Sequence, residues 1–269
     1  MAFSAAEAAM PEGPSIVILK EAARQFEGRT IAAASGNSGG IDFAALPGQP
    51  LLAVRSWGKH LLLELPLFSL RIHLLMFGSY RINERKPDAV PRLALRFAEG
   101  GELNFYTCSV RQIAEALDTV YDWRVDVMAD AWEPRLALRQ LRAKPQMLAC
   151  DALLDQNIFS GVGNIIKNEV LFRLRIHPLS KVKDIPATKL RELVKQARQY
   201  SFEFKQWKQA SVLKQHWLAH TRRICPRCRI PLQKAHLGLT RRRSFWCERC
   251  QKRYDSAARP ASVANERKQ

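Results

Sequence analysis

Residues 156–166 read Gln-Asn-Ile-Phe-Ser-Gly-Val-Gly-Asn-Ile-Ile, a sequence typical of a glycine-containing turn between two helices. Glycine lets the backbone approach a ligand closely, and a helix that begins at Asn164 presents free amide hydrogens and a partial positive charge to an anion. Asn164 could instead cap this helix with its own side chain. The stretch therefore predicts a helix–turn–helix connection whose turn is either phosphate-binding or purely structural.

The sequence on either side of this turn differs in its hydrophobic pattern. Helices are expected over residues 136–154, 164–175 and 187–204, whereas short apolar runs at 61–65, 70–75, 93–97 and 103–106 indicate strands, the last two joined by a turn at 99–102. A helix over residues 15–26 precedes them, with Pro14 near its start and Gly28 beyond its end. The pattern predicts an α+β protein with a β-rich N-terminal domain, a leading helix and a helical C-terminal domain.

Two cysteine pairs lie near the C-terminus, Cys225-Pro-Arg-Cys228 and Cys247-Glu-Arg-Cys250, with 18 residues between them. A tight CxxC turn places two thiolates on one side of a metal, so two such turns predict one structural Zn²⁺ site with four cysteine ligands. A redox pair is the alternative. The other cysteines, Cys108 and Cys150, are isolated in apolar surroundings, a distribution that favours a reducing compartment over a disulfide framework.

The charge balance favours a polyanionic partner. Forty-three Lys and Arg against 25 Asp and Glu give a formal net charge of +18, which attracts nucleic acid in a salt-dependent manner. Three arginines at 241–243 lie between the cysteine pairs, where their guanidinium groups can bind adjacent phosphates, although a solvated basic loop would look the same. No apolar run is long enough to span a membrane, and residues 1–10 lack the pattern of a secretory signal.

Four segments stand out along the chain: Pro11-Glu12-Gly13-Pro14, Gly58-Lys59-His60 with the leucines after it, residues 155–172, and the cysteine ribbon with Arg242 five residues before Cys247. In this order they resemble the formamidopyrimidine-DNA glycosylase and endonuclease VIII family, with endonuclease VIII the closer branch. The resemblance implies a β-sandwich domain with its leading helix over residues 11–122, a helix-two-turn-helix domain over 133–222 and a zinc-ribbon finger over 223–253. A basic, disordered tail is expected over 254–269.

The same resemblance implies a bifunctional DNA glycosylase and AP lyase of base excision repair. Pro11 at a free N-terminus is a secondary amine with a pKa of roughly 8, which can attack the sugar C1′ of a damaged nucleotide and form a Schiff base. Strand cleavage by β,δ-elimination follows. Glu12 would act as general acid or base, while Lys59, Arg242 and Asn164 would hold the phosphates around the lesion.

The damaged base must leave the helical stack before it can be reached. By resemblance, Leu75-Met76-Phe77 would fill the space that the base vacates, since apolar side chains wedge between base steps in other DNA-binding proteins. Three apolar residues in a strand are equally compatible with a position in the core. The sequence leaves both alternatives open.

Three features depart from the family pattern. Ten residues precede Pro11, so a free amine requires translation from Met10 and removal of that methionine, or proteolysis. Ser15 occupies a position where many members have glutamate. Residues 106–111 lack the Asp-Pro-Arg-Arg-Phe signature of the purine-directed branch, and residues 177–225 are too few for its lesion-capping loop. The missing signature and the short segment 177–225 both resemble endonuclease VIII and imply oxidised pyrimidines as substrates.

Two other classes of protein remain as alternatives. One is a non-catalytic zinc-finger DNA-binding relative with a blocked proline, and the other is a zinc-ribbon protein associated with RNA. Under the main hypothesis the partner is damaged DNA, the chain is a monomer without membrane contact, and its location is cytoplasmic, of the bacterial type with action at the nucleoid. Truncation after about Lys252 is expected to leave the zinc site intact.

Overall fold

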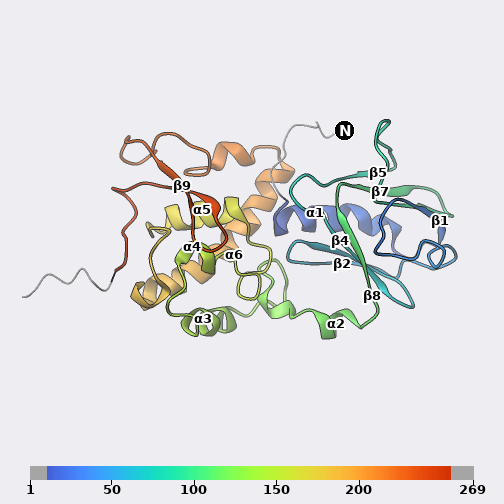
Figure 1. Cartoon of the computed structure of the whole chain (residues 1–269), viewed down its shortest axis with the longest axis horizontal. Coiled ribbons are helices and arrows are strands. Elements are labelled where there is room, and N and C mark those ends of the chain that lie inside the picture. The colour runs from blue at the N-terminus through green and yellow to red at the C-terminus, as the bar shows by residue number, and fades with distance from the viewer. Residues whose placement is uncertain (1–10, 256–269) are drawn as a thin grey trace, which may run out of the picture.

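The computed structural model describes residues 11–255, which form two domains joined by a short helical segment. In Figure 1 the strand-rich N-terminal domain, blue to green, occupies the right of the view, and the helical C-terminal domain with its finger, yellow to red, occupies the left. The joining segment contains α2 (Leu117–Val120) and a 3-10 turn (Trp123–Val125). The expected domain order is therefore the observed one.

The N-terminal domain begins with α1 (Gly13–Ala23), which continues into a 3-10 turn at Arg24–Phe26. Two four-stranded antiparallel sheets follow, in the orders β1-β6-β7-β5 and β2-β3-β4-β8. Their strands are β1 (Ile31–Ser35), β2 (Ala53–Trp57), β3 (His60–Glu64), β4 (Ser69–His73), β5 (Ser79–Ile82), β6 (Leu93–Phe97), β7 (Glu102–Tyr106) and β8 (Ser109–Ile113). Apolar side chains of both sheets and of α1 share one buried core, so the predicted β-sandwich with a leading helix is confirmed.

The strands that the sequence predicted are present, and the turn at 99–102 is a hairpin in which the Phe97 N–H donates to the Gly101 carbonyl at 3.0 Å. Strands β1, β2, β5 and β8 were not predicted. Three consecutive alanines at 32–34 give β1 little intrinsic strand preference. This strand lies at the edge of its sheet and pairs with β6 alone, so tertiary pairing decides its conformation.

The C-terminal domain is built around α5 (Asn164–Arg173), in which eight of ten residues are buried. Helices α4 (Ala149–Ala152) and α6 (Ala187–Gln209) pack against it and α3 (Pro134–Arg142) packs against α6, with 3-10 turns at Val182–Asp184 and Leu213–His216. A helix buried on nearly every side belongs at the centre of a bundle. Helix α6 also contacts α1 of the sandwich, where Lys205 and Glu21 form an ion pair. The two domains therefore share an interface as well as a linker.

One expected helix, over residues 136–154, is wrong as a single element. Helix α3 ends at Arg142 and α4 begins at Ala149. Pro145 lies between them and has no N–H to continue a helical hydrogen-bond ladder. The break is stabilised from outside, because the Lys183 N–H donates to the Pro145 carbonyl and the Ala149 N–H donates to the Ser180 carbonyl.

The finger contains a two-stranded antiparallel hairpin of β9 (Gln233–Leu237) and β10 (Arg242–Trp246). The four cysteines lie on either side of it in the sequence and come together at its base. Beyond Asp255, the expected basic tail lies outside the described residues. Within residues 11–255, no helix has both the length and the apolar character of a membrane span.

Candidate active site

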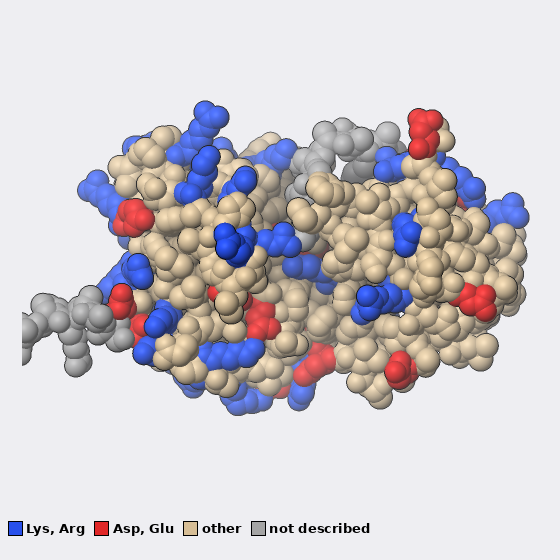
Figure 2. Space-filling model, in the orientation of Figure 1, with Lys and Arg blue, Asp and Glu red and all other residues tan. Residues whose placement is uncertain are grey.

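Side chains from three of the four sequence segments line one cleft of about 430 Å³ between the sandwich, the α4–α5 connection and the finger. Its walls carry Trp57, Lys59, His60, His73, Leu154, Gln156, Asn164, Thr240 and Arg242. Figure 2 shows Lys and Arg side chains along the boundary between the two domains, and more densely over the C-terminal domain than over the sandwich. The predicted phosphate contacts Lys59, Asn164 and Arg242 therefore face a common, positively charged space.

The fourth segment, Pro11–Pro14, lies at the junction of the two domains. The Glu12 carbonyl accepts the first helical hydrogen bonds of α1, from the Ser15 and Ile16 N–H groups. The Gly13 N–H donates to the Gly161 carbonyl at 2.8 Å. Pro11 is half-buried and directly precedes Glu12, whose carbonyl is bonded to α1 and whose neighbour Gly13 is bonded to Gly161.

The Glu12 side chain crosses the domain boundary and binds the first turn of α5. Its carboxyl oxygens accept hydrogen bonds from the N–H groups of Ile165 at 2.7 Å and of Gly163 and Ile166 at 3.2 Å. A Cβ atom at position 163 would overlap the Glu12 carboxyl group, so glycine is required there. The anion at this helix N-terminus is therefore a carboxyl group of the chain itself.

This contact corrects two expectations about Asn164. The residue before it, Gly163, is the N-cap of α5, and Asn164 does not cap the helix with its side chain. Three of the amides that were expected to be free for a phosphate are bonded to Glu12. The amide oxygen of Asn164 is buried and has no hydrogen-bond partner among the described residues, although the side chain lines the cleft. Any contact of Asn164 with a ligand would therefore use its side chain.

Burial shifts the pKa of both charged groups at this junction. Removal from water raises the pKa of Glu12, against the opposing effects of Lys59 and of the three amides. Burial likewise lowers the pKa of Lys59, Arg242 lowers it further, and Glu12 opposes the change. A carboxyl group with a raised pKa beside a lysine with a lowered one is shifted in the direction that favours proton exchange with a ligand.

The β2–β3 turn that carries Lys59 is docked onto the C-terminal domain. Gly58 has φ +55° and donates its N–H to Asp126 at 2.9 Å, and a Cβ atom there would overlap the Ser160 hydroxyl. Burial raises the pKa of Asp126 to about 6. Sequence reasoning missed Asp126, because a single aspartate 68 residues from its partner gives no local signal.

The finger turn that precedes Arg242 is held by a second missed carboxylate, Asp151 of α4. Asp151 accepts hydrogen bonds from the Leu239 N–H at 3.0 Å and from the Thr240 N–H and hydroxyl at 3.3 Å. The contact joins residues 88 and 89 positions apart, so it too was invisible to sequence spacing. Asp151 thereby fixes the turn whose last residues face the cleft.

Leu75, Met76 and Phe77 lie on the β4–β5 turn and are 46%, 48% and 67% exposed. The alternative that they belong to the core is therefore wrong. They do not line the cleft itself, but they follow His73, which does. Their exposure leaves the assignment as a DNA wedge open as a proposal.

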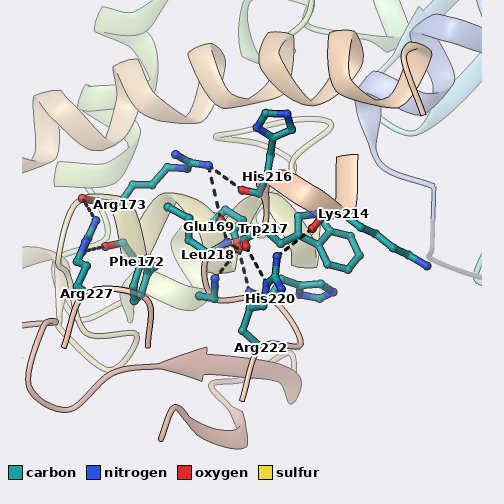
Figure 3. Close-up of polar contacts among 11 residues, drawn as sticks. Glu169, Phe172, Arg173, Lys214, His216, Trp217, Leu218, His220, Arg222 and Arg227 are labelled. Atoms are coloured by element: carbon teal, nitrogen blue, oxygen red, sulfur yellow. Dashed lines mark hydrogen bonds and ion pairs between the residues drawn. The ribbon is translucent and has the colours of Figure 1, made fainter. Parts of the chain in front are cut away.

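Figure 3 shows how Glu169, Phe172 and Arg173 of helix α5 contact the segment that leads into the finger. Glu169 accepts the N–H groups of Leu218, Ala219 and His220 at 2.8–3.0 Å. At the end of the helix, Arg227 from the first CxxC pair donates to the Phe172 carbonyl at 2.8 Å. The helix whose first turn binds Glu12 therefore also binds residues 218–220, which lead into the finger, and Arg227 at the base of the finger.

The four cysteines Cys225, Cys228, Cys247 and Cys250 place their sulfur atoms within 4.8 Å of one another, so they could hold one metal ion. Four thiolates on two tight turns are the donor set of a structural tetrahedral site, without an open position for a substrate. The sequence prediction of a closed metal site is supported by this geometry.

Comparison with known proteins gives two family matches. The family model of the formamidopyrimidine-DNA glycosylase N-terminal domain matches residues 10–112, and that of the formamidopyrimidine-DNA glycosylase H2TH domain matches residues 125–201. The two matches cover the sandwich, the segments around Glu12, Lys59 and Asn164, and most of the helical domain.

Among curated proteins, Endonuclease 8-like 3 of Xenopus laevis is 30% identical over 223 residues, 78% of this chain and 36% of that protein. Endonuclease 8-like 2 of Bos taurus is 34% identical over 198 residues, 68% of this chain and 58% of that protein. The chain thus spans about a third to three fifths of the length of these relatives. Both are vertebrate proteins, which gives no support to the expected bacterial type of location.

Among solved structures, the Lactococcus lactis formamido-pyrimidine DNA glycosylase non-covalently bound to AP-site-containing DNA superposes with a TM-score of 0.76. It is 20% identical, and the alignment covers 90% of this chain and 99% of that one. At this identity the likeness shows a shared fold.

Proposed function

The chain belongs to the formamidopyrimidine-DNA glycosylase and endonuclease VIII family, and from that premise we propose that it is a bifunctional DNA glycosylase and AP lyase of base excision repair. It removes oxidised bases, with a preference for pyrimidines, and then cuts the strand by β,δ-elimination. The observation that carries the proposal is the meeting of Lys59, Asn164 and Arg242 around one cleft, with Glu12 bonded to the helix that starts at Asn164.

The nucleophile is the amine of Pro11. In the neutral form its lone pair attacks C1′ of the damaged nucleotide, a new N–C1′ bond forms, and the base leaves with the electrons of the glycosidic bond and a proton. Opening of the sugar ring gives the Schiff base. Loss of a C2′ proton then expels the 3′ phosphate, and a second elimination expels the 5′ phosphate.

This chemistry requires a mature chain that begins at Pro11, because an amide nitrogen has no available lone pair. Translation from Met10 followed by removal of that methionine would supply it. The match to the family N-terminal domain begins at residue 10, which supports this start. Met10 itself lies outside the described residues.

Glu12 moves the protons. Its buried carboxyl group, with a pKa raised by burial, can donate a proton to the sugar ring oxygen and take it back later in the reaction. The three amides of α5 hold the carboxyl group one residue from the Pro11 nitrogen. A general acid in a fixed position avoids the reorganisation that a mobile side chain would need.

The remaining residues hold the DNA. Lys59, Arg242 and the side-chain amide of Asn164 contact phosphates around the lesion, and the exposed Leu75-Met76-Phe77 turn fills the vacated base position. The metal at the four cysteines is zinc, which stabilises the finger and takes no part in the reaction. The working form is a monomer bound to damaged DNA.

Two features support a preference for oxidised pyrimidines. The curated relatives are endonuclease 8-like proteins. Residues 106–111 comprise the last residue of β7, the turn at 107–108 and the start of β8, without the purine-branch signature. A non-catalytic DNA-binding relative with a blocked proline is the second candidate, because the sequence carries residues before Pro11.

Borohydride trapping tests the proposal on an oligonucleotide that carries one thymine glycol or one abasic site. One protein form begins at Pro11, and the other begins at Met1 with Met10→Leu, so that translation cannot start internally. We expect a covalent adduct from the first form alone, and its loss or clear weakening in Pro11→Gly. If neither form gives an adduct while both bind the oligonucleotide, the non-catalytic candidate replaces the enzyme.

A further inference from the structure

The finger hairpin presents basic side chains on both of its faces. Successive residues of a strand point to opposite sides, and residues directly paired across two strands share a side. Arg242 lines the cleft described above, so Arg243 points away from it. Arg243 pairs with His236, and Phe245 pairs with Lys234, which places Lys234 on the face of Arg243.

The face of Arg243 borders a second groove, also of about 430 Å³. Four cationic side chains, Arg222, Arg223, Lys234 and Arg243, line it together with the ring of Phe245. Two of them come from the hairpin and two from the segment that enters the finger. None of these side chains lines the first cleft, so the groove is a separate site on the opposite face of the hairpin.

The charge of this groove is not neutralised by nearby carboxylates. Among the described residues, none of the four cations forms an ion pair with Asp or Glu. Arg222 donates instead to the neutral backbone carbonyls of Trp217 at 2.9 Å and Lys214 at 3.4 Å, contacts drawn in Figure 3. Residues 223–253 contain ten Lys and Arg and one Glu. Such a concentration of cations attracts a polyanion.

The groove is also mounted on the buried helix α5. The Lys167 ammonium group donates to the Ser244 hydroxyl at 2.8 Å, and the Phe245 N–H donates to Asn168 at 3.1 Å. Glu169 holds residues 218–220, directly before Thr221 and Arg222. The hairpin and the segment that enters the finger are therefore both attached to the same helix. This attachment fixes the spacing between the two sides of the groove and their distance from the first cleft, as a site for a polymer with regularly spaced charges requires.

We propose that this second groove binds a second stretch of DNA phosphodiester backbone, so that the finger hairpin lies between two backbone segments. This inference rests on the proposed function and extends it to a residue set outside the cleft. The ligand chemistry is the phosphodiester group. Its source is either the complementary strand of a duplex or the continuation of the damaged strand.

The test compares two triple variants of the full chain that lose the same charge. The groove variant carries Arg223→Gln, Lys234→Gln and Arg243→Gln, and the control carries Arg229→Gln, Arg249→Gln and Lys252→Gln, exposed residues that line neither cavity. The dissociation constant for a duplex and for a single strand of equal length, each with one abasic-site analogue, is measured from 50 to 300 mM salt. Metal content and thermal unfolding verify that both variants are folded.

We expect the groove variant to bind duplex at least about tenfold more weakly than the control, with a salt slope that is smaller by about 1 for each phosphate that the groove no longer binds. A defect confined to the duplex assigns the groove to the complementary strand, and an equal defect on both DNAs assigns it to the damaged strand. Equal affinities and slopes in the groove variant and the control overturn the inference while leaving the proposed function intact. Failure of the wild-type chain to bind either DNA overturns both.

Discussion

Two regions of helix α5 show how one bonding pattern can serve two purposes. At the start of the helix, Glu12 accepts three backbone N–H groups, and in its middle, Glu169 also accepts three. The two residues are equally buried, at 1% and 0% exposure. Glu12 lies beside Lys59 next to the cleft, whereas Glu169 faces Arg173 and the loop that enters the finger.

Hydrogen bonds alone therefore do not distinguish a reacting carboxyl group from a structural one. Both glutamates join two parts of the chain that are far apart in sequence. Only Glu12 contacts the start of the helix that brings Asn164 to the cleft, and only Glu12 lies beside a cleft-lining cation, Lys59, whose own pKa is shifted by burial. We therefore assign chemistry to the first region of α5 and attachment of the finger to the second.

A matched pair of variants, Glu12→Gln and Glu169→Gln, tests this assignment. We expect Glu12→Gln to cause the largest loss of activity. Each change replaces charge-assisted hydrogen bonds, which are worth roughly 1.5–3 kcal/mol, so each lowers the free energy of unfolding by a similar amount. Glu12→Gln alone should also lower the single-turnover rate of base release by about 10²–10⁴-fold, because general acid–base catalysis is lost. Rates at saturating DNA and denaturant unfolding curves measure the two effects separately.

Each variant is the control of the other. A rate loss in Glu169→Gln as large as that in Glu12→Gln, with DNA saturated and the protein folded, would remove the distinction between the two regions. A near-normal rate in Glu12→Gln would instead make Glu12 a capping residue like Glu169.

A smaller effect is expected from Asp151, whose carboxylate accepts backbone N–H groups of the finger turn. Asp151→Asn should loosen the turn before Arg242 and weaken DNA binding about tenfold, or roughly 1.4 kcal/mol, with little change in the rate at saturation. Asp88→Asn, an exposed change of equal charge, is the control. A lower rate at saturating DNA with unchanged affinity would instead mean that Asp151, like Glu12, acts in the reaction.

Glu12, Asp126 and Asp151 also mark the limit of what the sequence could predict. Motif spacing found the segments around Glu12, Lys59, Asn164 and Arg242, and hydrophobic periodicity found the helix at 164 and the strand at 93–97, because these signals are local. The bond from Glu12 to α5 spans more than 150 residues, and those from Asp126 and Asp151 span 68 and 88. No local pattern records such partners, which is why the sequence left the first amides of α5 either free for a phosphate or capped by Asn164, whereas Glu12 binds them.

The smallest effect concerns two histidines, one in each region of this comparison. His60 lines the cleft beside Lys59, and the backbone N–H of His220 donates to Glu169. Burial lowers the pKa of His60 to about 3 and that of His220 to about 4, so both are neutral in the folded chain, whereas in the unfolded chain they take up protons near pH 6.5. Their contribution to stability is thus complete above pH 6.5 and declines as the pH falls towards the folded values.

Thermal unfolding between pH 7.5 and 5 should therefore show a midpoint that falls more steeply for the wild type than for His60→Gln or His220→Gln. The comparison is made as a difference, because Asp126 and Glu12, whose pKa values are raised by burial, bind protons in the folded state and oppose the trend in all three proteins. A slope that flattens in His220→Gln but not in His60→Gln would mean that the cleft around His60 is open enough to hydrate an imidazolium. Lys59 adjoins His60 in the chain and interacts with Glu12, so such hydration would weaken the case that burial sets the pKa of this charged pair, and this small effect bears directly on the largest one.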